Sequence, residues 1–178
     1  MIGWYHSGST ALRAVLVPRL SEKRAVREQT MPAEFKKLGV TFQYPENWQL
    51  DEDQAAGGHS VTVYSPGGAF WQIGIHPRST DPARLANSAL KAMQEEYEGV
   101  ENEAVEEAVA DCDLVGFNLN FFYLDLTNTA LIRCLRGDRG TFSIFCQAED
   151  REFRELERVF AAITYSFLTG LALHHHAD

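Results

Sequence analysis

The sequence predicts an α+β fold, with a central antiparallel sheet of about six strands and two long amphipathic helices. Short alternating apolar runs occur in groups joined by short turns, which favours antiparallel over parallel pairing. Two long segments instead repeat apolar residues every three or four positions, as amphipathic helices do. The 178 residues suit one domain, because a chain of this size buries about 68–70% of its unfolded surface.

The first predicted strand runs from Val40 to Tyr44, where alternating apolar residues stop at Pro45, which lacks a backbone N–H. The polar stretch from Asp51 to Gly58 predicts a loop. A hairpin follows, with Pro66, Gly67 and Gly68 at its tip. Its strands are predicted over Ser60–Ser65 and Ala69–His76.

The second hairpin strand separates two sets of side chains by alternation. Trp71, Ile73 and Ile75 share one face. Phe70, Gln72, Gly74 and His76 share the other. The first set predicts a core face and the second a more polar one.

Asp81 and Pro82 predict the start of an amphipathic helix, because Asp caps helix N-termini and Pro fits the first helical position. Its apolar stripe ends near Gly99. A second long helix is predicted over Glu149–Leu168, ended by Gly170. The strands between them are predicted over Glu101–Ala110 at an exposed sheet edge, Leu114–Leu124, Thr129–Arg136 and Thr141–Gln147.

The charge distribution argues against nucleic-acid binding. The net charge is −9. Residues 1–30 hold five basic and two acidic side chains, a balance of +3, so the remainder carries −12. Such an acidic body repels phosphate backbones and anionic membranes.

No apolar run approaches the roughly 20 residues that a membrane-spanning helix needs.

Residues that could bind a metal or act in catalysis do not form a known motif. Cys112, Cys134 and Cys146 lack CxxC spacing, and buried free thiols in a reducing compartment fit them best. The tract from His174 to His176 could chelate nickel or copper, but such a terminal tract is more often a tag remnant or a disordered tail. The seven glutamates between Glu95 and Glu107 predict a solvated acidic surface, or a docking patch for a basic partner. No cofactor or metal is predicted.

Residues 1–34 are predicted to be an N-terminal extension: a flexible arm, a weak transit-like segment or a segment upstream of the true start at Met31. Residues 35–168 form the predicted single domain and residues 169–178 a C-terminal tail. The apolar residues near the N-terminus are interrupted by Arg13, Pro18 and Arg19, which does not fit a secretory signal. A cytoplasmic location is the resulting expectation.

Three segments carry a resemblance to a known family: FQYPENW, the hairpin VTVYSPGGAFWQIGI, and VFAAITYSF in the last helix. Together with the order of elements, they resemble the PsbP-like fold family over roughly Phe35 to Leu168. That family includes the extrinsic subunit of photosystem II and a nuclear-transport regulator that binds the Ran GTPase. The resemblance implies a sheet sandwiched by helices and a non-enzymatic role in binding or assembly.

A mixed polar and aromatic sheet face is the predicted ligand-binding or partner-binding site. Asn118 and Asn120 alternate with apolar residues in one strand, and Gln72, His76 and Arg133 are predicted to extend the same face. The leading hypothesis is a non-catalytic domain that binds a protein partner with the acidic surface of Glu95–Glu107 or with this face. The alternative is a small-molecule carrier or weak enzyme with a pocket on these five residues.

Overall fold

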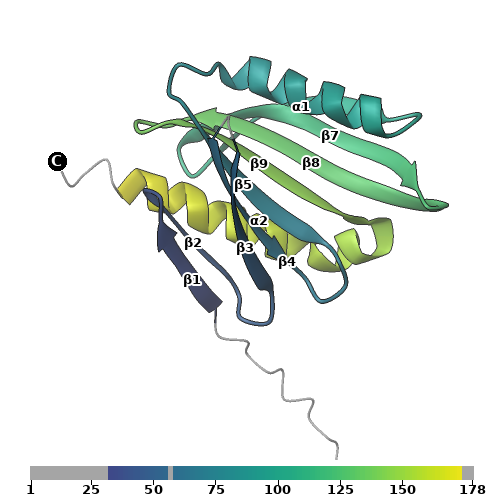
Figure 1. Ribbon diagram of the computed structural model, residues 1–178, viewed down its shortest axis with the longest axis horizontal. Coiled ribbons are helices and arrows are strands. Elements are labelled where there is room, and N and C mark those ends of the chain that lie inside the picture. Colours follow the sequence, from purple (N-terminus) through teal and green to yellow (C-terminus); the bar gives the residue numbers. More distant parts are fainter. Residues whose placement is uncertain (1–31, 56–57, 174–178) are drawn as a thin grey trace, which may run out of the picture.

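The computed structural model describes residues 32–55 and 58–173 and confirms an α+β fold (Figure 1). Its main sheet has seven antiparallel strands rather than about six. In spatial order they are β3 (Gln49–Ala55), β4 (Gly58–Tyr64), β5 (Phe70–His76), β9 (Thr141–Glu149), β8 (Leu126–Arg136), β7 (Cys112–Tyr123) and β6 (Glu101–Val109).

Helices cover the two faces of this sheet in Figure 1. Helix α1 (Pro82–Glu96) packs with Leu119 and Ile132 into one apolar cluster. Helix α2 (Asp150–Leu173) packs with Trp71 and Ile144 into the other, larger cluster. The sheet therefore separates two cores, which gives the predicted layer order of helix, sheet and helix.

A small second sheet, formed by β1 (Pro32–Lys37) and β2 (Val40–Pro45), lies against α2 (Figure 1). Phe42 is fully buried in the α2 core, and the backbone N–H of Gln43 donates to Ser166 Oγ at 2.9 Å. The sequence analysis did not predict β1. Its hairpin turn consists of Leu38 and Gly39, both at positive φ.

Strand β3 was predicted to be a loop, and that prediction is wrong. Its residues pair with β4 along seven positions, from Gln49 opposite Tyr64 to Ala55 opposite Gly58. The misleading signal was the polarity of Asp51–Gln54. An edge strand can carry such residues because its side chains remain solvated.

Secondary structure extends beyond residues 35–168, the predicted domain, at both ends. Pro32–Glu34 belong to β1, and α2 continues through Gly170 to Leu173. A Cβ at position 170 would lie 2.7 Å from the carbonyl oxygen of Thr41. Glycine there lets α2 approach β2 closely and does not end the helix. The predictions for residues 1–31 and for the histidine tract lie outside the described residues.

Strand β7 ends in a two-residue turn on each side. Ala110 and Asp111 connect it to β6, and Leu124 and Asp125 connect it to β8. All four residues have φ between 50° and 62°. Both turns are therefore of the I′ type, which favours Asn, Asp and Gly because most other residues resist positive φ.

Candidate functional site

The five residues predicted to share one face lie on both faces of the sheet. Gln72 pairs with Phe145, which pairs with Ile132, and Ile132 belongs to the α1 core. Arg133 follows Ile132 along β8 and therefore points to the α2 side. Gln72 and His76 thus lie on the α1 side, whereas Asn118, Asn120 and Arg133 lie on the α2 side. The prediction of a common face is wrong, because alternation within single strands does not define the register between them.

On the α2 side, Arg133 forms a network of hydrogen bonds, although this residue is only 9% exposed. Its Nε donates to Glu107 Oε1 at 2.5 Å, and an Nη donates to Asn118 Oδ1 at 2.7 Å. Another Nη donates to the carbonyl oxygens of Phe117 and Ile132. The guanidinium therefore links β8 to β6 and β7, which is a structural role.

Asn120 belongs to a second chain of hydrogen bonds on the same side. Its amide donates to Thr129 Oγ1 at 3.1 Å, and this hydroxyl donates to Asp150 Oδ1 at 2.8 Å. Asn118 also donates to Glu103 Oε2 at 3.3 Å. These amides are satisfied by neighbouring strands and by the first turn of α2.

On the α1 side, Gln72 donates to Thr62 Oγ1 at 3.0 Å, and His76 Nε2 lies 3.0 Å from Ser143 Oγ. Burial lowers the pKa of His76, because removing water disfavours the charged imidazolium. Each side chain is thus bonded to an adjacent strand. Whether either group of predicted residues binds a ligand stays a prediction.

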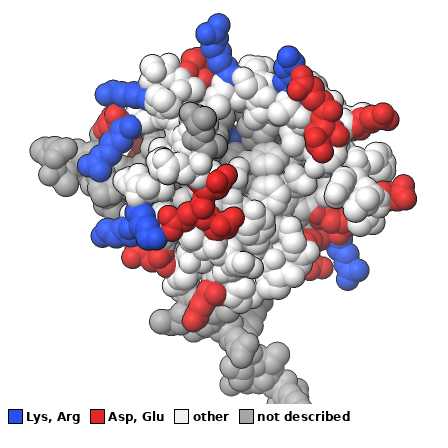
Figure 2. All heavy atoms as spheres, in the orientation of Figure 1, with Lys and Arg blue, Asp and Glu red and all other residues white. Residues whose placement is uncertain are grey.

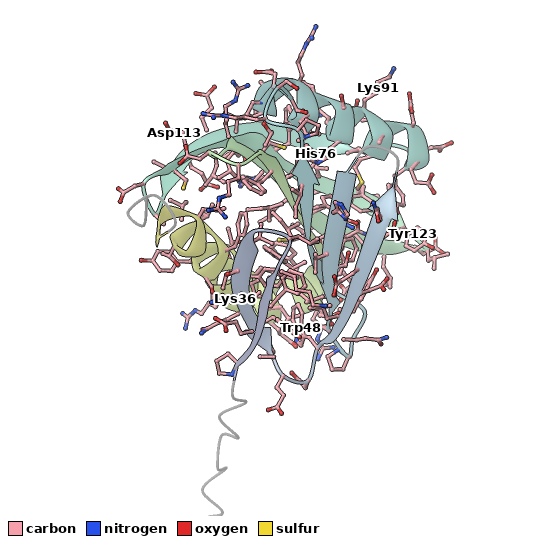
Figure 3. All side chains as sticks on the ribbon, turned by 60° about the vertical axis from the view of Figure 1, so that its left-hand side comes forward. Lys36, Trp48, His76, Lys91, Asp113 and Tyr123 are labelled. Atoms are coloured by element: carbon pink, nitrogen blue, oxygen red, sulfur yellow. The ribbon has the colours of Figure 1, made fainter. Side chains whose placement is uncertain are left out.

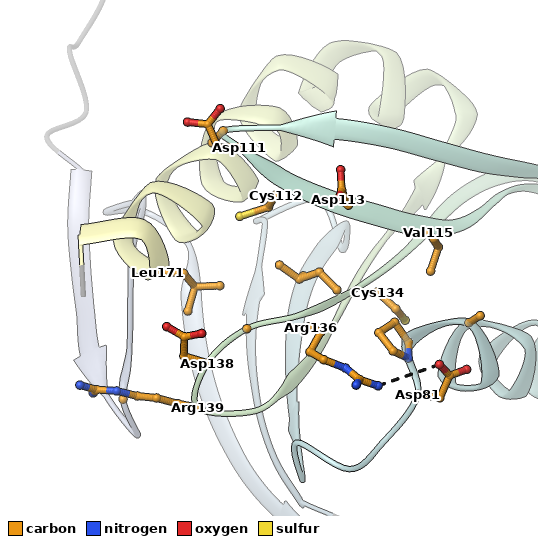
Figure 4. Close-up of a pocket in the computed structure, with 16 residues that line it drawn as sticks. Asp81, Asp111, Cys112, Asp113, Val115, Cys134, Arg136, Asp138, Arg139 and Leu171 are labelled. Carbon is orange, nitrogen blue, oxygen red and sulfur yellow. Dashed lines mark ion pairs between the residues drawn. The ribbon is translucent and has the colours of Figure 1, made fainter. Parts of the chain in front are cut away.

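The structure does form a large pocket, but at one end of the sheet, where β7 and β8 diverge. Their ladder begins at Val115 opposite Cys134, although β7 starts at Cys112 and β8 continues to Arg136. The sheet therefore forks into the β6–β7 and β8–β9 hairpins. A space of about 890 Å³, here called the fork pocket, lies at this fork (Figure 4).

Charged side chains border the fork pocket (Figure 4). Asp81 accepts a hydrogen bond from the Arg84 N–H at 2.9 Å and so caps α1. Its other oxygen lies 4.0 Å from Arg136 Nη2, which also donates to the Thr80 carbonyl at 3.3 Å. Asp111 and Asp113 lie across the opening from this pair, and both are exposed.

Two of the three free cysteines, Cys112 and Cys134, line this pocket. Burial raises the pKa of Cys134 to about 12, and burial also raises the pKa of Cys146. Burial raises the pKa of Cys112, with a further contribution from the carboxylates of Asp111 and Asp113. All three are therefore protonated and weakly nucleophilic near neutral pH.

The other end of β7 carries an exposed apolar group, here called the apolar tip. Phe122 is 68% exposed, Tyr123 49%, Leu124 76% and Leu126 55%. Tyr123 makes a ring contact with Tyr97 beside α1, with ring centroids 5.6 Å apart. Figure 3 shows Tyr123 and Asp113 at opposite sides of the molecule. The missed sequence signal was the unbroken apolar run from Phe121 to Leu124, since a strand end must expose part of such a run.

Acidic side chains surround the apolar tip. Glu101 pairs with Asn120, two residues before Phe122, and Asp125 lies in the turn itself. We define the acidic rim as Glu95, Glu96, Glu98, Glu101, Glu103 and Asp125. In Figure 2, most charged side chains on the right of the visible face, where the β7–β8 hairpin ends in Figure 1, are acidic.

Within residues 32–55 and 58–173, no three histidine, cysteine or acidic side chains are grouped so that they could hold a metal ion. Neither α1 nor the described length of α2 combines the length and apolar character that a membrane-spanning helix requires.

No family model matches this chain, and neither does any curated protein. The chain is similar in structure to CyanoP, the cyanobacterial PsbP of Synechocystis, with a TM-score of 0.54 and 13% identity over 77% of this chain and 91% of CyanoP. It also matches LpqN, a Mycobacterium tuberculosis protein involved in cell envelope biogenesis, with a TM-score of 0.44 and 12% identity over 75% of this chain and 86% of LpqN. The likeness to CyanoP shows that the fold is PsbP-like, as the resemblance in sequence implied.

Proposed function

We propose that the protein is a non-catalytic binding domain that docks onto a protein partner through the apolar tip. The main observation in support of this proposal is that Phe122, Leu124 and Leu126 are all exposed at one end of the β7–β8 hairpin. Single exposed apolar residues are common on protein surfaces, whereas a concentration of them points to an interaction site. Here they lie around one turn, with Tyr123 and Leu126 on one face of the hairpin and Phe122 on the other, so a partner would enclose the hairpin end. A partner that buries this group removes the cost of its hydration.

The backbone of the tip supports the same proposal independently. Leu124 has a φ of 50°, a conformation that costs a leucine more than an asparagine or a glycine. The leucine side chain at that position is 76% exposed, so little of its apolar surface is buried to offset this cost. Backbone strain of this kind is often retained for function.

The acidic rim indicates what kind of partner fits. A complementary surface would have an apolar pocket with lysine or arginine side chains around it. The same charges repel anionic membranes, the other surface that an apolar tip could enter. The proposal combines two predictions from the sequence: a protein partner, and an acidic surface on which that partner docks.

The test compares Leu124→Asn with Ala110→Asn in affinity capture from native lysate. Both substitutions place Asn at the first position of a I′ turn, so neither should unfold the chain. A partner that docks at the tip should be retained by the wild type and by A110N, and its recovery should fall at least about tenfold with L124N. Equal recovery with both variants would contradict docking at the tip.

Ionic strength provides a second readout. Contacts with the acidic rim should weaken as salt rises, because the Debye length falls from about 10 Å at 0.1 M to about 3 Å at 1 M. Binding of anionic vesicles by the wild-type chain, lost in L124N, would instead assign the tip to a membrane.

The alternative was a small-molecule carrier. The five residues predicted to form its pocket cannot line one pocket, because they are divided between the two faces of the sheet. The fork pocket offers another location for such a ligand.

A further inference from the structure

The fork pocket has the form of a ligand site, and the docking surface at the apolar tip does not use it. Its volume of about 890 Å³ falls within the roughly 300–1,000 Å³ of typical ligand pockets. Apolar walls come from Pro82, Val115, Leu135 and Leu171. These residues belong to both helices and to both strands of the fork, so the pocket is part of the folded core structure.

The main chain at the fork strengthens this interpretation. Residues 112–114 of β7 and residues 135 and 136 of β8 have no partner across from them in the β7–β8 ladder. Elsewhere in the sheet β7 and β8 pair continuously from Val115 to Tyr123. A ligand in the fork can therefore meet main-chain groups as well as side chains.

The charged residues that line the pocket indicate which charge its ligand should carry. Four aspartates and two arginines border the pocket. Arg136 is already paired with Asp81 and bonded to the Thr80 carbonyl. Asp111 and Asp113 have no ion pair or hydrogen bond in the described part of the chain. The two thiols add no charge, so the pocket carries an excess of negative charge around an apolar floor.

We propose that the fork pocket binds an aliphatic amine, a ligand with an apolar body and at least one protonated amino group. The body would lie against the apolar walls, and the ammonium group would lie at the opening near Asp111 and Asp113. A concave site with low-dielectric walls concentrates the field of such carboxylates. This inference is independent of the apolar tip, which lies at the other end of β7.

The test uses three probes with the same carbon chain: diaminooctane, octanediol and octanedioate. Each is titrated into the full chain at low salt, with amide NMR shifts as the readout. Diaminooctane should shift amides of residues 110–113 and 135–139 and should bind at least about fivefold more tightly than octanediol. Octanedioate should not bind.

The matched variants are Asp111→Asn and Asp125→Asn. Both residues occupy the second position of a I′ turn, with φ of 60° and 62°, and both lose one negative charge. D111N should weaken diaminooctane binding about two- to fivefold, whereas D125N should leave it unchanged. Equal affinity for octanediol, tighter binding of octanedioate, shifts outside the pocket, or equal effects of the two variants would each overturn the proposal.

Discussion

The two turns at the ends of β7 have the same backbone conformation but different surroundings. Ala110 and Asp111 lie beside the fork pocket, where α1, α2 and both hairpins meet. Leu124 and Asp125 extend into solvent at the apolar tip. Their φ values agree within about 12°, from 50° to 62°. One end of the strand therefore lines a pocket, whereas the other end leaves large apolar side chains exposed.

The same turn conformation thus occurs in two different surroundings, which are set by how the neighbouring strands pair. At the pocket end, β7 pairs with β6 while β8 pairs with β9, and the two hairpins separate. At the tip, β7 and β8 stay paired to the last residue before the turn, Tyr123 opposite Leu126. The main variant in each prediction below changes a residue in one of these turns or in the β7–β8 ladder that joins the two ends.

The largest effect is expected for Arg133→Met, in β8 opposite Gly116 and close to the start of the β7–β8 ladder. The substitution removes hydrogen bonds to Glu107, Asn118 and two carbonyls, and should lower the free energy of unfolding by about 2–3 kcal/mol. Urea denaturation measures this change in the free energy of unfolding. Glu107→Gln, which keeps an acceptor for the guanidinium, should cost less. A loss at only one of the two binding sites, in a chain that remains folded, would show that Arg133 does more than link strands.

Asparagine at the first turn position should stabilise both ends. Ala110→Asn and Leu124→Asn each relieve an unfavourable positive φ, and we expect a gain of about 0.5–1 kcal/mol from each. Thermal unfolding of the two variants provides the comparison. If L124N is instead destabilising, the leucine makes contacts within the fold, and the argument from strain at the tip fails.

The smallest effect concerns the thiol at the pocket end. The carboxylates of Asp111 and Asp113 contribute to the raised pKa of Cys112. Asp111→Asn removes one of these negative charges, so the pKa of Cys112 should fall and more thiolate should form at a given pH below that pKa. The midpoint of the pH–rate profile for alkylation by iodoacetamide should therefore move to lower pH in D111N. D125N serves as the control and should leave the midpoint in place.

The elements with a clear local pattern were predicted from the sequence. The β4–β5 hairpin, α1 with its Asp81 cap, and the edge position of β6 are confirmed. Their signals lie within a few residues, in alternation, capping and turn chemistry. Strands β1 and β3 were missed because their residues are mostly polar and exposed, so no apolar period identifies them.

The candidate site was harder to predict. Gln72 and Arg133 each alternate correctly within their own strands, but the register through Phe145 and Ile132 puts them on opposite faces. The fork pocket has no signal in the sequence at all. It depends on where the β7–β8 ladder stops, and its walls come from segments as distant as Pro82 and Leu171.

The sequence by itself determined the α+β class, the helices and most strands, because their periods and turns depend on neighbouring residues. The two I′ turns were not predicted, because Ala110 and Leu124 are unusual residues for such turns and were assigned to strands. Only the tertiary structure decided which polar side chains share a face, where the sheet forks and which apolar side chains at the tip are exposed. These properties depend on hydrogen bonds and packing between segments far apart in the chain, which no local pattern records.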